Sequence, residues 1–377
     1  MSLEATYTGL RVLDLATNIA GPYAAMILGD MGADVIKIER PPHGDDTRSL
    51  EPRSGGQSTV FLAVNRNKRS ILLDLKSAEG RETLLRLVET ADVVIESFPP
   101  GLAAKLSLTY DDFRGRKADI ILCSISAFGD GPIGSQMPGY DALVQAVSGL
   151  MSFTGNPGEP TVRIAPSILD LSTGMWAAIG VMGALTRRIA GQGGDHVRPT
   201  LIDSAFNIMN HQLLGYLATG AVPQKLGSGA PSASPYAVYQ AMDGELLIAT
   251  ASEAQFPRLC SALGVEQLAT DPRFLAMALR IENRDALDSA IAEVVAEGTV
   301  EHWIAVLGDA GISCGRVNTV ADACELPVVM ERALWIGASN AEGVIPQLRL
   351  PIGSSQNGVR QPPLLDEHSA EILATLT

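Results

Sequence analysis

Arg11-Val12-Leu13-Asp14-Leu15 is the stretch that decides the fold. It is a short and mostly apolar run, typical of a β-strand, and a helical pattern from Pro22 to Met31 follows it. The next apolar run, Val35-Ile36-Lys37-Ile38, predicts a second strand. Buried strands that alternate with helices predict an α/β fold, a parallel sheet with helices on both faces.

The alternation continues along the first two hundred residues. Further strands are predicted at Ile71-Leu72-Leu73-Asp74-Leu75, at Val93-Val94-Ile95 and from Ile120 to Cys123, with a helix from Ala78 to Thr90 between the first two. Ligands of such sheets bind at the carboxyl ends of the strands, so we expect the functional site at that edge.

A second, smaller unit is predicted after a change in composition. The segment 224–235 is rich in Gly, Ser and Pro and is typical of a loop or linker. Beyond it, the pattern predicts strands at 236–241 and 246–250, and then helices at 253–263, 284–296 and 300–307. Strands followed by helices predict an α+β domain.

Composition excludes several classes of function. The chain of 377 residues has a formal net charge of -14, which argues against nucleic acid or an anionic membrane as a partner. The four cysteines are scattered without a C-x-x-C pair, as expected of reduced thiols in a cytoplasmic protein. No histidine spacing predicts a metal site, and the start of the chain carries no signal-peptide pattern. The most apolar uncharged stretch, 174–185, is too short to span a bilayer and predicts a buried helix.

Asp170 is the strongest candidate for chemistry. It lies in Ser167-Ile168-Leu169-Asp170-Leu171-Ser172-Thr173-Gly174, at the start of a long apolar helical pattern. We expect its carboxylate to cap the helix and to stay ionised at the positive end of the helix dipole, as a nucleophilic carboxylate must. A helix cap without any catalytic role is the alternative interpretation.

A basic cluster is the candidate site for a phosphate group. Residues 65–69 carry Arg66, Lys68 and Arg69, and Lys76 follows. Such groups suit the phosphates of a nucleotide-like ligand, while the alternative is a solvated basic surface. The chain has no G-x-G-x-x-G, P-loop or G-x-S-x-G motif, so no nucleotide redox cofactor and no α/β-hydrolase nucleophile is predicted.

An ordered series of motifs resembles the class III CoA-transferases, a family that includes formyl-CoA and carnitine CoA-transferases and acyl-CoA racemases. The similarity spans essentially the whole chain. In chain order the matching segments are residues 9–14, Ala20-Gly21-Pro22, residues 32–40, Asn67-Lys68-Arg69-Ser70-Ile71, Ala91-Asp92-Val93, Gly139-Tyr140-Asp141, Leu169-Asp170-Leu171, Asp271-Pro272-Arg273-Phe274, residues 311–315 and Glu367-His368.

The resemblance implies a fold and a site. Asp170 would be the catalytic nucleophile. Other residues would lie along bound coenzyme A, namely Ile19, Ala20, Arg40, Leu73, Lys76, Ser97, Phe98, Lys105, Pro138 and Tyr140. A large Rossmann-like domain (1–220) would be followed by a linker and small domain (221–325) and by a return segment (326–377) that completes the large domain. Two chains would form an interlocked homodimer.

The chain departs from the family pattern at several positions. Ile19 replaces the glutamine of formyl-CoA transferases, which argues against formyl and oxalyl substrates. Lys105 replaces an arginine and Asp366 replaces a glycine. The glycine-rich loop over the active site has no clear match, although Gly227-Ser228-Gly229 is a candidate.

The predicted reaction moves CoA from an acyl-CoA thioester to a carboxylic acid through aspartyl anhydride and aspartyl-CoA thioester intermediates, without metal or ATP. Backbone N–H groups at the helix start would stabilise the oxyanions, and Tyr140 would position the acyl carbonyl. The alternative is an acyl-CoA racemase, which needs an acid/base pair. Racemases of this fold have histidine before aspartate where this chain has Tyr140-Asp141, so one partner of that pair is missing. A non-catalytic CoA-binding protein would not need Asp170.

Overall fold

The chain folds as two compact units. The computed structural model describes residues 5–340, 343–352 and 359–376. The large unit comprises Met1–Leu150, Ile164–Ala218 and Ala333–Thr377, and the small unit comprises Met151–Arg163 and Thr219–Arg332. This division differs from the expected domain bounds mainly at 151–163, which groups with the small unit.

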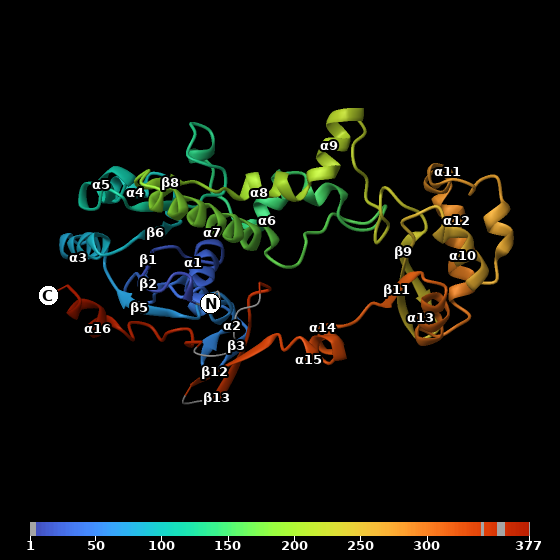
Figure 1. Cartoon of the computed structure of the whole chain (residues 1–377). Coiled ribbons are helices and arrows are strands. Elements are labelled where there is room, and N and C mark those ends of the chain that lie inside the picture. Colours follow the sequence, from blue (N-terminus) through green and yellow to red (C-terminus); the bar gives the residue numbers. More distant parts are fainter. Residues whose placement is uncertain (1–4, 341–342, 353–358, 377) are drawn as a thin grey trace. The chain divides into compact units, whose positions relative to one another are not determined.

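A six-stranded parallel sheet forms the centre of the large unit (Figure 1), so the α/β fold is confirmed. Its spatial order is β5-β2-β1-β6-β7-β8, and every neighbouring pair runs parallel. The order steps outward in both directions from β1, so the loops after β1 and β6 lie at a switch point where such sheets bind ligands. The strands are β1 (Arg11–Asp14), β2 (Asp34–Glu39), β5 (Lys68–Leu72), β6 (Val93–Glu96), β7 (Ile121–Ser124) and β8 (Asp195–Val197).

Helices connect these strands and cover the sheet. α1 makes its most extensive contact with α7, and α3 packs on α5. Other elements of the large unit are two-stranded ribbons, β3 (Arg53–Ser54) with β4 (Gln57–Ser58) and β12 (Trp335–Asn340) with β13 (Gly343–Leu348). The helices are α1 (Ala20–Asp30), α2 (Thr59–Val64), α3 (Ala78–Glu89), α4 (Leu102–Leu106), α5 (Tyr110–Arg116), α6 (Asp141–Val147), α7 (Ile168–Ile189), α8 (Leu201–Ile208), α9 (Asn210–Thr219) and α16 (Ser369–Ala374).

The helix α7 is longer than the apolar stretch 174–185 on which the sequence-based expectation rested. By length and composition it is the one helix among the described residues that is able to cross a membrane. Half of its most apolar 18-residue stretch is buried inside the fold, and a helix in the core of a globular protein can have the same length and composition. Its packing against α1, β7 and β8 accounts for the apolar character of its buried face.

A network of buried charges holds the loop after β1. The Nζ of Lys68 donates to Asp14 Oδ2 (2.7 Å), and the Nζ of Lys37 lies 2.9 Å from Asp45 Oδ2 and 3.6 Å from Asp14 Oδ2. Lys37 also donates to the carbonyl oxygen of Ala16 (3.0 Å), and the N–H of Ala16 donates to Asp14 Oδ1 (3.1 Å). Burial lowers the pKa of Lys37, but the carboxylates of Asp14 and Asp45 more than offset it, so the pKa is raised. Each buried charge therefore has a partner, as burial of charge requires.

The basic cluster at 65–69 is neither a phosphate site nor a solvated surface. The guanidinium of Arg66 pairs with Asp30 (2.5 Å) and that of Arg69 pairs with Asp34 (2.7 Å), and both arginines are buried. With Lys68 also buried, the cluster is part of the interior. The strand β5 accordingly begins at Lys68 and not at Ile71, because ion pairs allow the charged side chains of Lys68 and Arg69 to lie inside the sheet.

The C-terminal segment lies along the outer edge of the sheet, next to β5 (Figure 1). The N–H of His368 donates to the Ser70 carbonyl (3.0 Å), and the N–H of Leu72 donates to the carboxylate of Asp366 (2.9 Å). Asp366 has a φ of 62°, a left-handed conformation that favours glycine. Here the aspartate keeps that conformation and uses its side chain to bind the strand edge.

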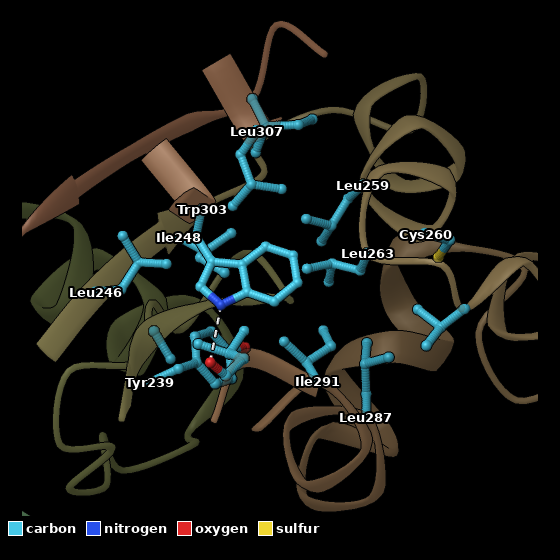
Figure 2. Close-up of a cluster of buried hydrophobic side chains, with 14 of the residues drawn as sticks. Tyr239, Leu246, Ile248, Leu259, Cys260, Leu263, Leu287, Ile291, Trp303 and Leu307 are labelled. Atoms are coloured by element: carbon cyan, nitrogen blue, oxygen red, sulfur yellow. Dashed lines mark hydrogen bonds between the residues drawn. The ribbon is translucent and has the colours of Figure 1, made fainter. Parts of the chain in front are cut away.

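A three-stranded antiparallel sheet and a helical layer form the small unit. The sheet order is β11-β10-β9, and α12 packs on β9 while α13 packs on β11. Trp303 lies at the centre of the core, surrounded by aliphatic side chains from the sheet and helices, and its indole N–H donates to the Val295 carbonyl (2.8 Å) (Figure 2). The elements are β9 (Tyr236–Ala241), β10 (Gly244–Ala249), α10 (Gln255–Ala262), α11 (Met277–Glu282), α12 (Arg284–Val295), α13 (Val300–Asp309), β11 (Ser313–Arg316), α14 (Val320–Cys324) and α15 (Pro327–Glu331).

The four cysteines carry free thiols. Cys123 and Cys260 are buried, and Cys314 and Cys324 are partly buried.

Candidate active site

The residues expected along CoA lie in segments that follow the carboxyl ends of parallel strands. Ile19 and Ala20 follow β1, Arg40 follows β2, Leu73 and Lys76 follow β5, Ser97, Phe98 and Lys105 follow β6, and Pro138 and Tyr140 follow β7. The carboxyl ends of parallel strands share one edge of a sheet, which is where such folds bind ligands. The fold therefore directs all five segments to the same edge.

Asp170 lies in the first turn of α7 and is not its cap. Ser167 occupies the N-cap position and its side chain makes no capping hydrogen bond. The carboxylate of Asp141 takes that role, because its Oδ2 accepts from the N–H of Leu169 (2.8 Å) and of Asp170 (3.2 Å). The expectation that Asp170 caps its own helix was wrong. Its side chain is consequently not engaged with the helix start.

Asp141 is the functional residue that the sequence reasoning missed. It begins α6 and is itself held by Gln145, whose Nε2 donates to Asp141 Oδ1 (2.6 Å). Gln145 also accepts from the N–H of Ile164 (2.9 Å), so one buried pair binds both the approach to α7 and its first turn. The spacing of an aspartate and a glutamine four residues apart on a short helix was the available signal.

The pKa of Asp170 is the main electrostatic feature of the site. Burial and then the negative charge of Asp141 raise the pKa of the Asp170 carboxyl to about 7. The expectation that the helix dipole keeps Asp170 ionised was wrong for the protein without ligand, since desolvation and a like charge outweigh it. At neutral pH the carboxyl is divided between its protonated and ionised forms.

The N–H groups at the start of α7 all have acceptors inside the protein. Those of residues 169 and 170 donate to Asp141, and those of residues 168 and 171 donate to the carbonyls of residues 166 and 167. These donors are therefore occupied, and in this arrangement they do not form the oxyanion site that the sequence suggested.

The start of α1 approaches the first turns of α7 closely. A Cβ on Gly174 would lie 2.6 Å from the carbonyl oxygen of Ala20, so only glycine permits this contact. Asp170 is four residues before Gly174 and lies on the same face of the helix. The packing of the two helices thus places Ala20 against Gly174, one helical turn from Asp170.

The expected phosphate-binding cations differ in availability. The side chain of Arg40 is 64% exposed and forms an ion pair with Asp46. Lys76 and Lys105 are exposed at the surface of the large unit. An exposed ion pair contributes about 1 kcal/mol or less, so the pairing with Asp46 leaves Arg40 accessible to a phosphate.

The loop after β6 is fixed on both sides. The hydroxyl of Ser97 accepts from the N–H of Thr17 (3.0 Å), and the N–H of Phe98 donates to Glu96 Oε2 (2.6 Å). This loop is therefore bound to the loop that leads to Ile19. Tyr140, by contrast, is 73% exposed and occupies the N-cap position of α6 without a side-chain hydrogen bond.

No cluster of His, Cys, Asp or Glu among the residues that the structure describes has the form of a metal site.

Comparison with known proteins identifies the family. The family model described as CoA-transferase family III matches residues 7–369 of this chain. The chain belongs to CoA-transferase family III. It is similar to the succinate–glutarate CoA-transferase of Agrobacterium fabrum, with 35% identity over 98% of this chain and 95% of the relative. The acetyl-CoA:oxalate CoA-transferase of Acetobacter aceti is 36% identical over 97% of this chain and 94% of the relative.

A solved structure shares the whole fold. The CAIB/BAIF family protein of Brucella suis superposes with a TM-score of 0.87 at 36% identity, covering 98% of this chain and 99% of that one. Family membership makes the chain an enzyme, a CoA-transferase that uses CoA thioesters as substrates.

The raised pKa of Asp170 predicts a dependence of stability on pH. A carboxyl whose folded pKa, about 7, exceeds its ordinary value of 3.8 destabilises the folded state above pH 7, and this penalty disappears as the pH falls toward 4. We expect Asp170→Asn to stabilise the protein at pH 8 by about 2 kcal/mol, or roughly 5 °C in Tm, and to lose most of this advantage at pH 4.5. Calorimetry at both pH values measures the effect. The exposed Glu51→Gln is the control, and an equal Tm of the wild type and Asp170→Asn at pH 8 would contradict the assignment.

Proposed function

We propose that this enzyme transfers CoA from an acyl-CoA thioester to a carboxylic acid with Asp170 as a covalent nucleophile. The observation that carries the proposal is the position of Asp170. Its carboxyl lies free of the helix cap, on the face of α7 that meets the start of α1, and Asp141 holds the backbone at that point. A fixed backbone with an uncommitted carboxylate is what nucleophilic attack requires.

The first half of the reaction loads CoA onto the enzyme. The ionised carboxylate of Asp170 attacks the thioester carbonyl, the C–S bond breaks, and a mixed anhydride and CoA thiolate result. The thiolate then attacks the aspartyl carbonyl of the anhydride. The donor acid leaves as its carboxylate, and an aspartyl-CoA thioester remains.

The second half runs the same steps in reverse. The acceptor carboxylate attacks the aspartyl-CoA carbonyl and expels the thiolate, giving a second anhydride. Attack of the thiolate on the acceptor's acyl carbon forms the new thioester and releases Asp170 as a carboxylate. One thioester and one carboxylate enter each cycle and one of each leaves, so the energy of the thioester is conserved and ATP is not needed.

The environment of Asp170 suits these steps. Partial burial weakens the hydration of the carboxylate and so favours attack, and the adjacent charge of Asp141 raises its basicity. Tyr140 precedes Asp141 and is exposed, so its hydroxyl is available to the acyl carbonyl.

We further propose dicarboxylic acids as substrates. The relative from Agrobacterium fabrum is named for succinate and glutarate, which are both dicarboxylates, whereas Ile19 argues against oxalate, for which the relative from Acetobacter aceti is named. An acid of this class presents one carboxylate for reaction and a second for recognition.

The racemase alternative has one observation in its favour. A carboxyl with a pKa of about 7 is suited to proton transfer at neutral pH. A racemase needs a second acid/base group, however, and the position where racemases have histidine is Tyr140. Asp141, the next carboxyl, is occupied by the first turn of α7 and by Gln145.

Asp170→Ala is expected to abolish transfer while CoA binding persists, because only the nucleophile is removed. Intact-protein mass spectrometry after incubation with a panel of acyl-CoA esters, including succinyl-CoA, should show a CoA adduct on the wild type. Hydroxylamine should convert that adduct to a hydroxamate at Asp170. Asp203→Ala, which removes a first-turn aspartate from α8, is the matched control and should still be labelled.

Two outcomes would contradict the covalent mechanism. One is full transfer by Asp170→Ala. The other is the absence of any adduct together with deuterium from solvent next to the thioester carbonyl, which would favour the racemase.

Arg40→Ala and Lys76→Ala are each expected to raise KM for the CoA ester about fivefold and to leave kcat nearly unchanged. A phosphate contact far from the reacting carbon stabilises ground state and transition state equally. Steady-state kinetics measures both constants. Arg53→Ala, the loss of an exposed arginine on the β3–β4 ribbon, should leave them unchanged, and an unaltered KM in both test variants would remove Arg40 and Lys76 from the site.

We also propose that the enzyme is a homodimer, interlocked as the family resemblance implies. Large apolar side chains are exposed on three consecutive helices, including Trp176 and Ile179 on α7, Phe206 on α8 and Leu217 on α9. Apolar surface gathered in this way is typical of a protein interface. Sedimentation equilibrium should give twice the mass of one chain, and the mass of a single chain at micromolar concentration would disprove the dimer.

A further inference from the structure

We propose that Glu96 is a positioning residue for CoA, and that Arg198, His196 and Ser124 form a directional hydrogen-bond chain that fixes its carboxylate. The inference rests on the proposed CoA site at the carboxyl edge of the sheet. It assigns a role to polar groups at the ends of β6, β7 and β8 that the transfer mechanism does not use.

The groups lie at the ends of three neighbouring strands. Glu96 ends β6 and Ser124 ends β7, and the two are paired directly in the sheet register. The hydroxyl of Ser124 lies 2.9 Å from His196 Nε2, on β8, and an interaction of the Ser124 side chain with the Glu96 carboxyl lowers the pKa of Glu96 against the effect of burial. Arg198 Nε donates to His196 Nδ1 over 3.1 Å. Four side chains thus follow one another across the edge of the sheet.

The donors and acceptors along this chain are determined by chemistry. A guanidinium has no acceptor, so Nδ1 of His196 must accept and Nε2 must carry the ring proton. Nε2 then donates to the oxygen of Ser124, which leaves the proton of the hydroxyl for the carboxylate of Glu96. Burial and the charge of Arg198 lower the pKa of His196 to about 4, which agrees with a neutral ring at pH 7.

This direction excludes a serine nucleophile. In a catalytic serine–histidine pair a carboxylate holds Nδ1 and the other nitrogen takes the serine proton. Here an arginine occupies Nδ1, so His196 donates to Ser124 and is unable to act as its base. The pair is built to deliver hydrogen bonds to Glu96.

The carboxylate of Glu96 holds the loop that begins at Ser97. Glu96 is buried, and its Oε2 accepts the N–H of Phe98 over the short distance of 2.6 Å. Burial raises the pKa of Glu96, while the bonds from Ser124 and from the N–H of Phe98 oppose this. Ser97 in turn accepts the N–H of Thr17. The Glu96 carboxylate therefore positions both expected CoA-binding loops, one directly and one through Ser97.

Glu96→Gln tests the role directly. The amide carries no charge and places an NH2 donor where the carboxylate has its second acceptor oxygen, so it holds the N–H of Phe98 and the hydroxyl of Ser124 less strongly. A hydrogen bond to a charged group contributes enough for about a tenfold loss of CoA affinity when it is broken. Titration calorimetry with CoA itself should show this loss, and KM for the ester should rise while kcat falls less than threefold.

Two further variants complete the experiment. Ser124→Ala leaves Glu96 in place but cuts the chain, and should weaken CoA binding about threefold. Asp195→Asn makes the same carboxylate-to-amide change beside His196 on β8, outside the chain, and should bind CoA like the wild type. Nitrogen NMR of labelled histidine should show His196 as the neutral Nε2–H tautomer at pH 7.

The outcomes separate this inference from the proposed function. Wild-type affinity for CoA in both Glu96→Gln and Ser124→Ala would overturn the positioning role while leaving the transferase intact. So would a loss confined to kcat, or a protonated or Nδ1–H His196. Failure of the unchanged enzyme to bind CoA would overturn the proposed function, and the role of Glu96 with it.

Discussion

The buried pairing of Lys68 and Lys37 with Asp14 is the interaction on which the site depends. Asp14 ends the central strand, and its carboxylate accepts from both the Lys68 ammonium and the N–H of Ala16. Removing one partner of a buried ion pair typically costs about 3–5 kcal/mol, because it leaves an uncompensated charge. The network therefore fixes the path from β1 into α1. That path determines where α1 begins, and the close contact of α1 with α7 then sets the position of Asp170.

The two carboxylates at the start of α7 show how function competes with stability. Asp141 is the better cap, since its oxygens bind two N–H groups and the amide of Gln145. Asp170 adds a second negative charge beside it and gains no compensating bond within the described residues. A site that keeps a basic, weakly solvated carboxylate carries such a cost, and in the mechanism we propose the resulting reactivity serves the attack on the thioester.

Sequence reasoning predicted the alternation of strands and helices because apolar runs and helical periodicity are local signals. Four of the five expected strands of the large unit lie within one or two residues of their predicted positions. The remaining strand, predicted to begin at Ile71, begins three residues earlier, at Lys68. The charges of Lys68 and Arg69 are neutralised by partners distant in sequence, so both residues fit inside the sheet. The same cause hid the interior location of the basic cluster. Asp170 was recognised from its helix start. The role of Asp141 depends on a contact across 28 residues, and the local spacing of Asp141 and Gln145 does not reveal that contact.

The return of the C-terminal segment to β5 has a consequence for synthesis of the protein. The N–H of Leu72 donates to the carboxylate of Asp366, which lies 294 residues further along the chain and is therefore synthesised much later. At the usual rates of translation, roughly 15–60 seconds separate the appearance of the strand from that of its cover. During this interval the nascent chain exposes an open sheet edge, which is the kind of surface that pairs with other chains. Docking of the segment around Asp366 on β5 thus comes late in the assembly of the large unit.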